Sequence, residues 1–239
     1  MDTLDPFAAN IPTPTAARPL LGLTVLVIED SRYACEAMRL LCLRSGARIR
    51  RADCLRSARR HLQVYRPSIV VVDLGLPDGN GVDLITELAQ AQADGTIVIA
   101  TSGDTHRAPD AMAAGAHGFL DKPVVSLAAF QELILSALPA DRLPASPRML
   151  SDETITPDRM AFQDDMSHIA EVLEDPPNDV ALDYVAQFLS GVARSADDPR
   201  LEKAALALAE KRALGQSAAS ETAQIAGLIQ QRLNQKIAI

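Results

Sequence analysis

The stretch that most constrains the fold is Ile69-Val70-Val71-Val72-Asp73, which is followed by Leu-Gly-Leu-Pro-Asp-Gly-Asn-Gly up to residue 81. Four β-branched residues in a row are typical of a strand buried on both faces, as in a parallel sheet. The run ends on a carboxylate and turn-forming residues follow. Asp73 should therefore lie in the crevice at the carboxyl end of a strand, where open α/β sheets bind ligands. An aspartate at this point could also simply cap the following turn.

Three further apolar runs also end in polar residues. Residues 23–28 lead into Glu29 and Asp30, residues 96–100 into Thr101, and residues 118–120 into Asp121 and Lys122. Because parallel strands bring their carboxyl ends to one edge, these side chains and Asp73 can converge. Three crowded carboxylates call for a divalent cation, and oxygen ligands with retained waters favour Mg²⁺. A lysine and a hydroxyl beside such a metal suit the oxygens of a phosphoryl group.

Four short motifs carry a resemblance to a known family. They read Val-Ile-Glu-Asp, Val-Val-Asp-Leu-Gly-Leu-Pro-Asp-Gly-Asn-Gly, Ala-Thr-Ser and Phe-Leu-Asp-Lys-Pro in chain order. In this order and spacing they resemble the receiver domain of bacterial two-component response regulators, the CheY-like family. The resemblance covers residues 22–138, which is about the size of one ordinary domain.

The resemblance implies a role for each site residue. Asp73 would accept a phosphoryl group from a histidine kinase or a histidine phosphotransfer protein. The residues implied for the metal site and for the switch that follows phosphorylation form two sets. Mg²⁺ would be held by Glu29, Asp30, Asp73 and the main-chain carbonyl of Gly75, while Lys122, Thr101 and Phe119 would form the phosphoryl-binding and switch group. Phe119 stands where the family usually has a rotating aromatic residue, often tyrosine, so only the packing half of that switch carries over.

The order of elements predicts the fold class. Strands and helices alternate through residues 22–138, five of each, which indicates a doubly wound five-stranded parallel sheet. The expected helices cover residues 31–45, 55–65, 82–91, 104–114 and 126–138, with the strand at residues 47–52 at the sheet edge because it carries three arginines. Ser31 should cap the first of these helices and Gly46 should end it.

The flanking regions differ from the predicted receiver. Residues 1–21 are rich in proline and small residues and are interpreted as a flexible leader. Residues 139–155 are interpreted as a linker, and residues 156–239 show four amphipathic helical patterns and no strand pattern. Pro157 suits a first helical position, Asn178 or Asp179 and Ser220 suit caps, and Met160 falls on an apolar stripe. Such a region suggests a small bundle or a dimerising module.

Composition narrows the function further. The net charge is −8, with a pI near 5.0, and residues 140–239 hold 16 acidic against 10 basic side chains. This balance argues against a broad nucleic-acid surface and against anionic membranes. We expect a cytoplasmic protein for three reasons. The cysteine count is odd, no apolar run approaches about 20 residues, and no signal-peptide pattern is present. No motif of an enzymatic output is present, so we expect no enzyme activity beyond self-phosphorylation and slow dephosphorylation of the receiver.

Two outputs remain open for the helical region. The first is a protein-interaction module, through a homodimer or another protein, that responds to the receiver. The second is a DNA-binding transcription regulator with a divergent helix-turn-helix, which the polar side chains of the last helical pattern keep open: Gln224, Gln230, Gln231, Arg232, Asn234, Gln235 and Lys236. The acidic balance makes DNA the weaker expectation.

Overall fold

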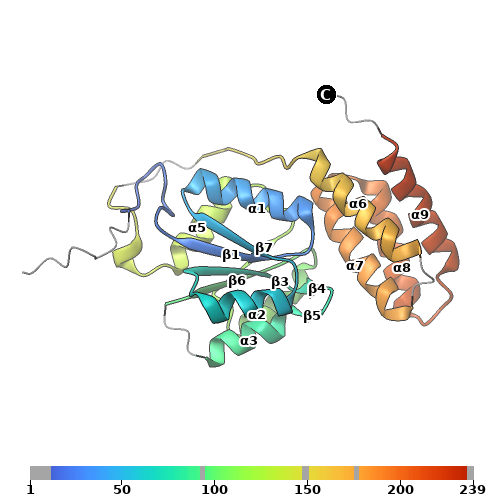
Figure 1. The fold of residues 1–239 in the computed structure, drawn as a ribbon, viewed down its shortest axis with the longest axis horizontal. Coiled ribbons are helices and arrows are strands. Elements are labelled where there is room, and N and C mark those ends of the chain that lie inside the picture. The colour runs from blue at the N-terminus through green and yellow to red at the C-terminus, as the bar shows by residue number, and fades with distance from the viewer. Residues whose placement is uncertain (1–11, 92–94, 147–150, 175–177, 236–239) are drawn as a thin grey trace, which may run out of the picture.

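The computed structural model describes residues 12–91, 95–146, 151–174 and 178–235. A sheet with helices on both faces lies beside a group of C-terminal helices. These helices lie beyond one end of the sheet, next to the short hairpin of β4 (Gly75–Leu76) and β5 (Gly79–Asn80) (Figure 1). The class predicted from the sequence, an α/β sheet followed by an all-α region, is confirmed.

The sheet has five parallel strands in the order β2-β1-β3-β6-β7. They are β1 (Thr24–Ile28), β2 (Arg48–Ala52), β3 (Ile69–Asp73), β6 (Ile97–Ser102) and β7 (Gly118–Asp121). Every residue of β3 is buried, as its β-branched run predicts, whereas β2 lies at the edge with three exposed side chains. Asp73 lies directly opposite Thr101 on the neighbouring strand, so the register brings two of the predicted site residues together.

Five helices cover the two faces of the sheet. They are α1 (Arg32–Ser45), α2 (Leu55–Val64), α3 (Gly81–Gln90), α4 (Ala108–Ala113) and α5 (Leu127–Ala137). Leu41 of α1 and Phe130 of α5 belong to one apolar cluster, while Leu55 of α2 and Ile85 of α3 belong to a second cluster. Two short 3₁₀ helices, Thr105–Arg107 and Ala140–Arg142, and a hairpin of β4 (Gly75–Leu76) and β5 (Gly79–Asn80) complete this part.

The ends of α1 follow the sequence signals. The Ser31 hydroxyl accepts a hydrogen bond from the Ala34 amide at 3.0 Å. At the other end Gly46 has φ 83°, a conformation that glycine adopts without the penalty other residues pay. This cap matters for the site, because Ser31 directly follows the two acids of β1.

The predicted leader and linker are more ordered than expected. Leu20 is fully buried and its amide donates to the Ser45 carbonyl, so the leader does not extend free to residue 21. Ile155 is buried in the apolar cluster shared by the sheet, α1 and α5, and its amide donates to the Val125 carbonyl at 2.8 Å. Apolar burial thus attaches both segments to the sheet. Residues 1–11 and 147–150 of the two predicted segments lie outside the described residues.

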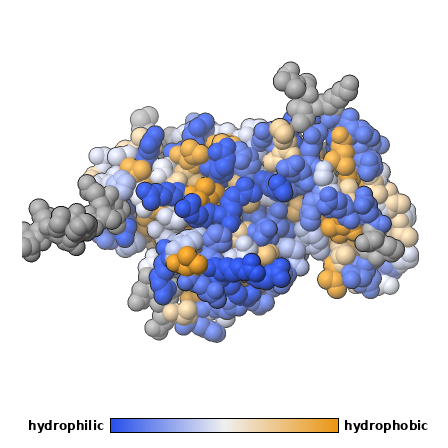
Figure 2. Space-filling view, viewed as in Figure 1, coloured by the Kyte–Doolittle hydropathy of each residue, from blue (hydrophilic) through white to orange (hydrophobic). Residues whose placement is uncertain are grey.

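The C-terminal region contains α6 (Arg159–Glu174), α7 (Asp179–Ser195), α8 (Pro199–Ala213) and α9 (Ala219–Leu233). Their apolar stripes meet in a cluster of their own, which includes Ile169, Leu189, Leu208 and Ile225. Most exposed apolar side chains on the visible face are scattered in small patches (Figure 2). The stripes predicted from helical spacing therefore pack mainly against one another within one copy of the chain.

Three local predictions for this region are wrong. Pro157 does not open a helix, because α6 begins at Arg159 and Pro157 is buried before it. Met160 is 60% exposed, since it lies in the first turn, outside the packed stripe. Ser220 does not cap α9, which begins at Ala219 without a side-chain cap. Asn178 does cap α7, accepting from the Ala181 amide at 2.8 Å.

Candidate functional site

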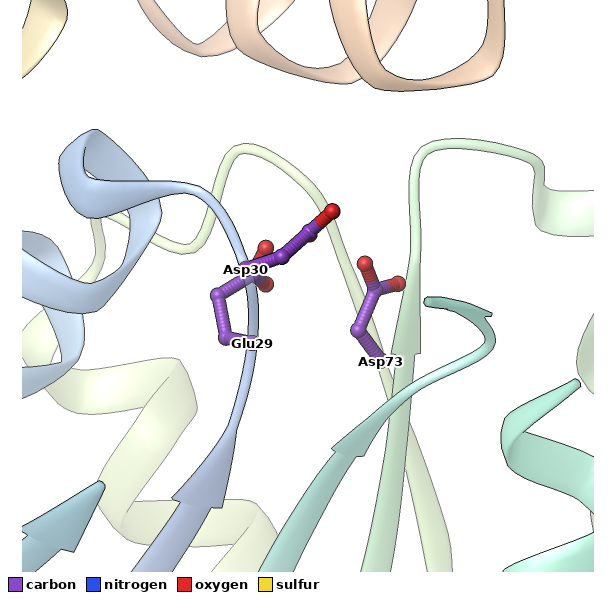
Figure 3. A group of neighbouring side chains, drawn as sticks. All are labelled: Glu29, Asp30 and Asp73. Carbon is purple, nitrogen blue, oxygen red and sulfur yellow. The ribbon is translucent and has the colours of Figure 1, made fainter. Parts of the chain in front are cut away.

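Three carboxylates meet at the carboxyl end of two neighbouring strands. Glu29 and Asp30 follow β1 directly, and Asp73 is the last residue of β3, which pairs with β1. One carboxylate oxygen from each residue lies within 4.8 Å of the other two. Figure 3 shows the Asp30 and Asp73 carboxylates on the two sides of the gap between the strands, both directed beyond the strand ends. The convergence expected from parallel topology is therefore present in the structure.

Lys122 supplies the counter-charge. Its ammonium lies 2.7 Å from a Glu29 oxygen and 2.9 Å from an Asp73 oxygen. The side chains of all three residues are at most 9% exposed. A buried ion pair of this kind costs desolvation energy, so it is weak evidence for a purely stabilising role and typical of a site that needs charge.

Burial and charge crowding shift the ionisation of the cluster. Burial, together with the neighbouring Asp73 carboxylate, raises the pKa of Asp30 to about 7. Burial is also the main cause that raises the pKa of Glu29 well above its ordinary value. For Lys122, burial opposes the charged ammonium, but Asp73 and Glu29 outweigh it and raise its pKa. When all three carboxylates are ionised, the cluster would hold more negative charge than one ammonium can neutralise.

The donor set fits a hard divalent cation. Three carboxylates offer oxygen ligands alone, with no histidine or cysteine among them, and such ligands suit Mg²⁺ better than a soft metal. Gly75, the fourth expected ligand, begins β4 and lines the same cleft as the acids. Burial is the main cause of the raised pKa values of Glu29 and Asp30, and neighbouring carboxylates add to it. A cation bound by Glu29, Asp30 and Asp73 would neutralise that neighbouring negative charge.

The two expected switch residues are placed differently from the acids. The Thr101 hydroxyl is buried and donates to the Leu120 carbonyl at 2.9 Å, so in this structure it is bonded to the neighbouring strand. Phe119 is half-buried and packs against the apolar cluster of α2 and α3. Thr101 lies opposite Asp73 in the sheet, but its hydroxyl donates to Leu120 rather than to Asp73, and Phe119 lies on the next strand.

Two residues of the C-terminal helices contact the site, and the sequence reasoning missed both. The Asp165 carboxylate of α6 accepts hydrogen bonds at the start of α1, from the Ser31 hydroxyl at 2.7 Å and from the Arg32 and Tyr33 amides at 2.7 and 3.1 Å. The Tyr184 hydroxyl of α7 donates to Asp30 Oδ2 at 2.8 Å. One signal was available: Asp165 falls on the apolar stripe of α6, three residues after Phe162 and four before Ile169.

Two clefts open between the receiver and the C-terminal helices. One, of about 740 Å³, is lined by Asp73 and Lys122 on the receiver and by Gln187, Gly191 and Arg194 on α7. The other, of about 850 Å³, reaches Asp30 from the side of Asp165 and Tyr184. In Figure 3 turns of the C-terminal helices pass above the three carboxylates. The acidic cluster therefore lies at the boundary between the two parts of the molecule.

Across the described ranges, no helix combines the length and the apolar character needed to cross a bilayer.

Comparison with known families and curated proteins gives a consistent result. The model of the response regulator receiver domain matches residues 25–134. The KDP operon transcriptional regulatory protein KdpE of Escherichia coli is 31% identical over 99 residues, which cover 41% of this chain and 44% of KdpE. The transcriptional regulatory protein CitB of Klebsiella pneumoniae is 33% identical over 107 residues, covering 43% of this chain and 45% of CitB. The chain thus spans less than half the length of these curated relatives.

Two solved structures that resemble about half of this chain are named response regulators. The response regulator TrrA of Thermotoga maritima, in complex with Mg²⁺ and BeF, has a TM-score of 0.45 and 19% identity, covering 48% of this chain and 99% of TrrA. A two-component response regulator from Clostridium difficile has a TM-score of 0.44 and 15% identity, covering 48% of this chain and 94% of that protein.

Proposed function

Residues 25–134 of this chain are a response regulator receiver domain, and from this premise we propose that the protein accepts a phosphoryl group on Asp73. The donor is a histidine kinase or a histidine phosphotransfer protein. The observation that carries the proposal is the position of Asp73 at the end of a buried strand, 2.9 Å from the Lys122 ammonium and beside two further carboxylates. That arrangement offers a nucleophilic oxygen and a cation for the incoming phosphoryl oxygens.

Mg²⁺ is the cofactor we propose for this site. Glu29, Asp30 and Asp73 would hold it, together with the main-chain carbonyl of Gly75. The ion supplies charge neutralisation when bound, and it positions phosphoryl oxygens. Lys122 neutralises the remaining charge, and Thr101 and Phe119 would respond to the modified Asp73. Self-phosphorylation and slow dephosphorylation are the only chemical activities in the proposal.

Labelling with acetyl phosphate and Mg²⁺ tests the acceptor. One phosphoryl group should be added to the parent protein, as measured by intact-protein mass spectrometry. Asp73→Asn should abolish the addition, because asparagine keeps the shape of the side chain but lacks the nucleophilic oxygen. Asp83→Asn, at a residue of α3 outside the acidic cluster, is the matched control and should be labelled like the parent. Undiminished labelling of Asp73→Asn would refute the assignment of the acceptor.

We propose protein contact as the output of the C-terminal helices. The region is acidic, and its apolar stripes pack into one cluster, which is the organisation of a folded module rather than of a charged nucleic-acid arm. Phosphorylation would then change self-association or the affinity for another protein. A homodimer and a distinct protein partner both satisfy the proposal.

DNA binding is the second candidate, because KdpE and CitB are named transcriptional regulatory proteins. Against it, Arg232, the arginine of α9, is engaged with Asp198 through two hydrogen bonds of 2.6 and 3.0 Å. Lys236, another of the polar residues that keep the DNA candidate open, lies outside the described residues.

Light scattering and duplex binding separate the two outputs. With beryllofluoride as a phosphoryl mimic, the full chain should change its self-association, or else gain or lose a protein partner in a pull-down. Sequence-specific duplex retention at near-physiological salt, with no change in protein contacts, would favour the DNA candidate, because specific DNA binding needs basic groups on the phosphates.

A further inference from the structure

The boundary between the receiver and the C-terminal helices is built from polar contacts at the acidic cluster. Asp165 is 1% exposed, and its carboxylate accepts from one hydroxyl and two backbone amides at the start of α1. These amides belong to the first turn of a helix, where donors lack partners within the helix and carry partial positive charge. The buried carboxylate accepts charge-assisted hydrogen bonds from these amides, and these bonds hold α6 against the receiver.

A second set of contacts places α7 over the phosphoryl-accepting end of the sheet. Tyr184 donates to Asp30, and an Arg194 guanidinium nitrogen donates to the Gly103 carbonyl, in the loop after β6. Gln187 lies so close to Gly75 that a β-carbon at Gly75 would overlap its carboxamide. Contacts with three separate loops of the sheet edge fix α7 above Asp73.

This placement limits what can reach Asp73. The residue is 6% exposed, and α7 forms one wall of the cleft that leads to it. A cleft of about 740 Å³ lies within the range of small-molecule pockets, about 300–1,000 Å³. A small acyl phosphate fits such a cleft. A histidine carried on a folded protein domain needs its imidazole beside Asp73, and α7 with its neighbouring helices occupies the approach.

We propose that the docked helices α6 and α7 select the class of phosphodonor, admitting small acyl phosphates to Asp73 and excluding histidine-bearing proteins until the helices release the receiver. The inference rests on the proposed function of Asp73. With an acyl phosphate, an Asp73 oxygen forms the new P–O bond while the P–O bond to the acyl group breaks, and the electron pair leaves with the carboxylate. With a protein donor the P–N bond breaks, and the imidazole keeps the electron pair and takes up a proton.

The test weakens docking without touching the receiver's own residues. Asp165→Ala with Tyr184→Phe removes the contacts to α1 and Asp30, while Ser31 still caps α1 through the Ala34 amide. The matched control is Glu210→Ala with Tyr65→Phe. Glu210 is an exposed carboxylate of α8, and the Tyr65 hydroxyl contacts His61 on α2, away from the boundary.

Each protein is labelled with acetyl phosphate and with a panel of phosphorylated histidine phosphotransfer domains. The ratio of the protein-donor rate to the acetyl phosphate rate should rise about tenfold or more in the double variant, since losing a hydrogen bond to a carboxylate typically shifts an equilibrium by this order. The rate with the large protein donor is proportional to the fraction of molecules in which the helices have released Asp73. The control should keep the parent's ratio. Dividing by the acetyl phosphate rate removes any change in labelling that the loss of the Tyr184 hydroxyl causes through Asp30.

A second measurement reports the loss of the Asp165 contacts without phosphorylation. Hydrogen exchange of the Arg32 and Tyr33 amides, followed by NMR, should be at least about tenfold faster in the double variant than in the parent and the control. The inference would be overturned if the ratio were the same in the parent and the double variant for every domain of the panel. Absence of transfer from the panel to both proteins counts as such a result. Equal exchange rates of the Arg32 and Tyr33 amides in the parent and the double variant would also overturn it. If acetyl phosphate still labels Asp73 in that case, the proposed function stands and only the inference fails.

Discussion

At the scale of single residues, the ionisation of Asp30 affects both the free energy of unfolding and the binding of a metal. Its pKa in the folded protein is raised to about 7, above an ordinary value of 3.8, mainly by burial. A raised carboxyl pKa contributes stability that is fully present below pH 3.8 and is lost as the pH rises through about 7. Each pKa unit corresponds to about 1.4 kcal/mol, so this loss amounts to a few kcal/mol at most.

We therefore predict a pH-dependent difference between the parent and Asp30→Asn. In the presence of EDTA, the free energy of unfolding of the parent should fall relative to that of the variant as the pH rises from about 4 to about 8. Mg²⁺ should offset the fall near pH 8 and do little near pH 4, because the metal binds deprotonated carboxylates. Urea unfolding at several pH values measures both effects. Parallel curves for parent and variant in EDTA would show that Asp30 ionisation does not oppose folding.

At the scale of elements, sequence signals were reliable where they act locally. The buried run of β3, the cap at Ser31 and the glycine at position 46 each depend on a few adjacent residues, and all three match the structure. The two-residue hairpin of β4 and β5 was not predicted, because it lies inside a loop whose glycines and proline suit several turn geometries. The predicted start of α6 failed for the same reason, since Pro157 is compatible with both a helix and an extended segment.

Contacts between distant elements could be predicted only in part. Parallel topology alone brought Glu29, Asp30, Asp73 and Lys122 to one edge of the sheet. No comparable rule says which face of a separate helical group meets that edge. The attachment through Asp165 therefore became visible only in the structure, although a carboxylate on an apolar stripe was its one local sign.

At the scale of the whole molecule, two apolar cores are joined by a short connection. The receiver clusters and the C-terminal cluster are separate, and polar contacts form much of the boundary between them. Ile155 is held in the receiver core, so only residues 156–158 separate it from α6. At about 3.3–3.6 Å per residue, such a tether spans roughly 10 Å. Released helices therefore remain close to the receiver at high effective concentration.

The tether makes a prediction for small-angle X-ray scattering. The variant Asp165→Ala with Tyr184→Phe should show only a small increase in radius of gyration, because the released helices pivot about residues 156–158. Adding Ile155→Ala should produce a clearly larger increase, since the loss of this buried side chain frees the segment back toward Leu143 and lowers the effective concentration of the helices. Ile155→Val, which keeps most of the buried volume, is the matched control and should resemble the two-substitution variant. If Ile155→Ala leaves the radius of gyration of the released protein unchanged, then Ile155 does not set the length of the tether, and the reach of the helices must be limited elsewhere along residues 139–158.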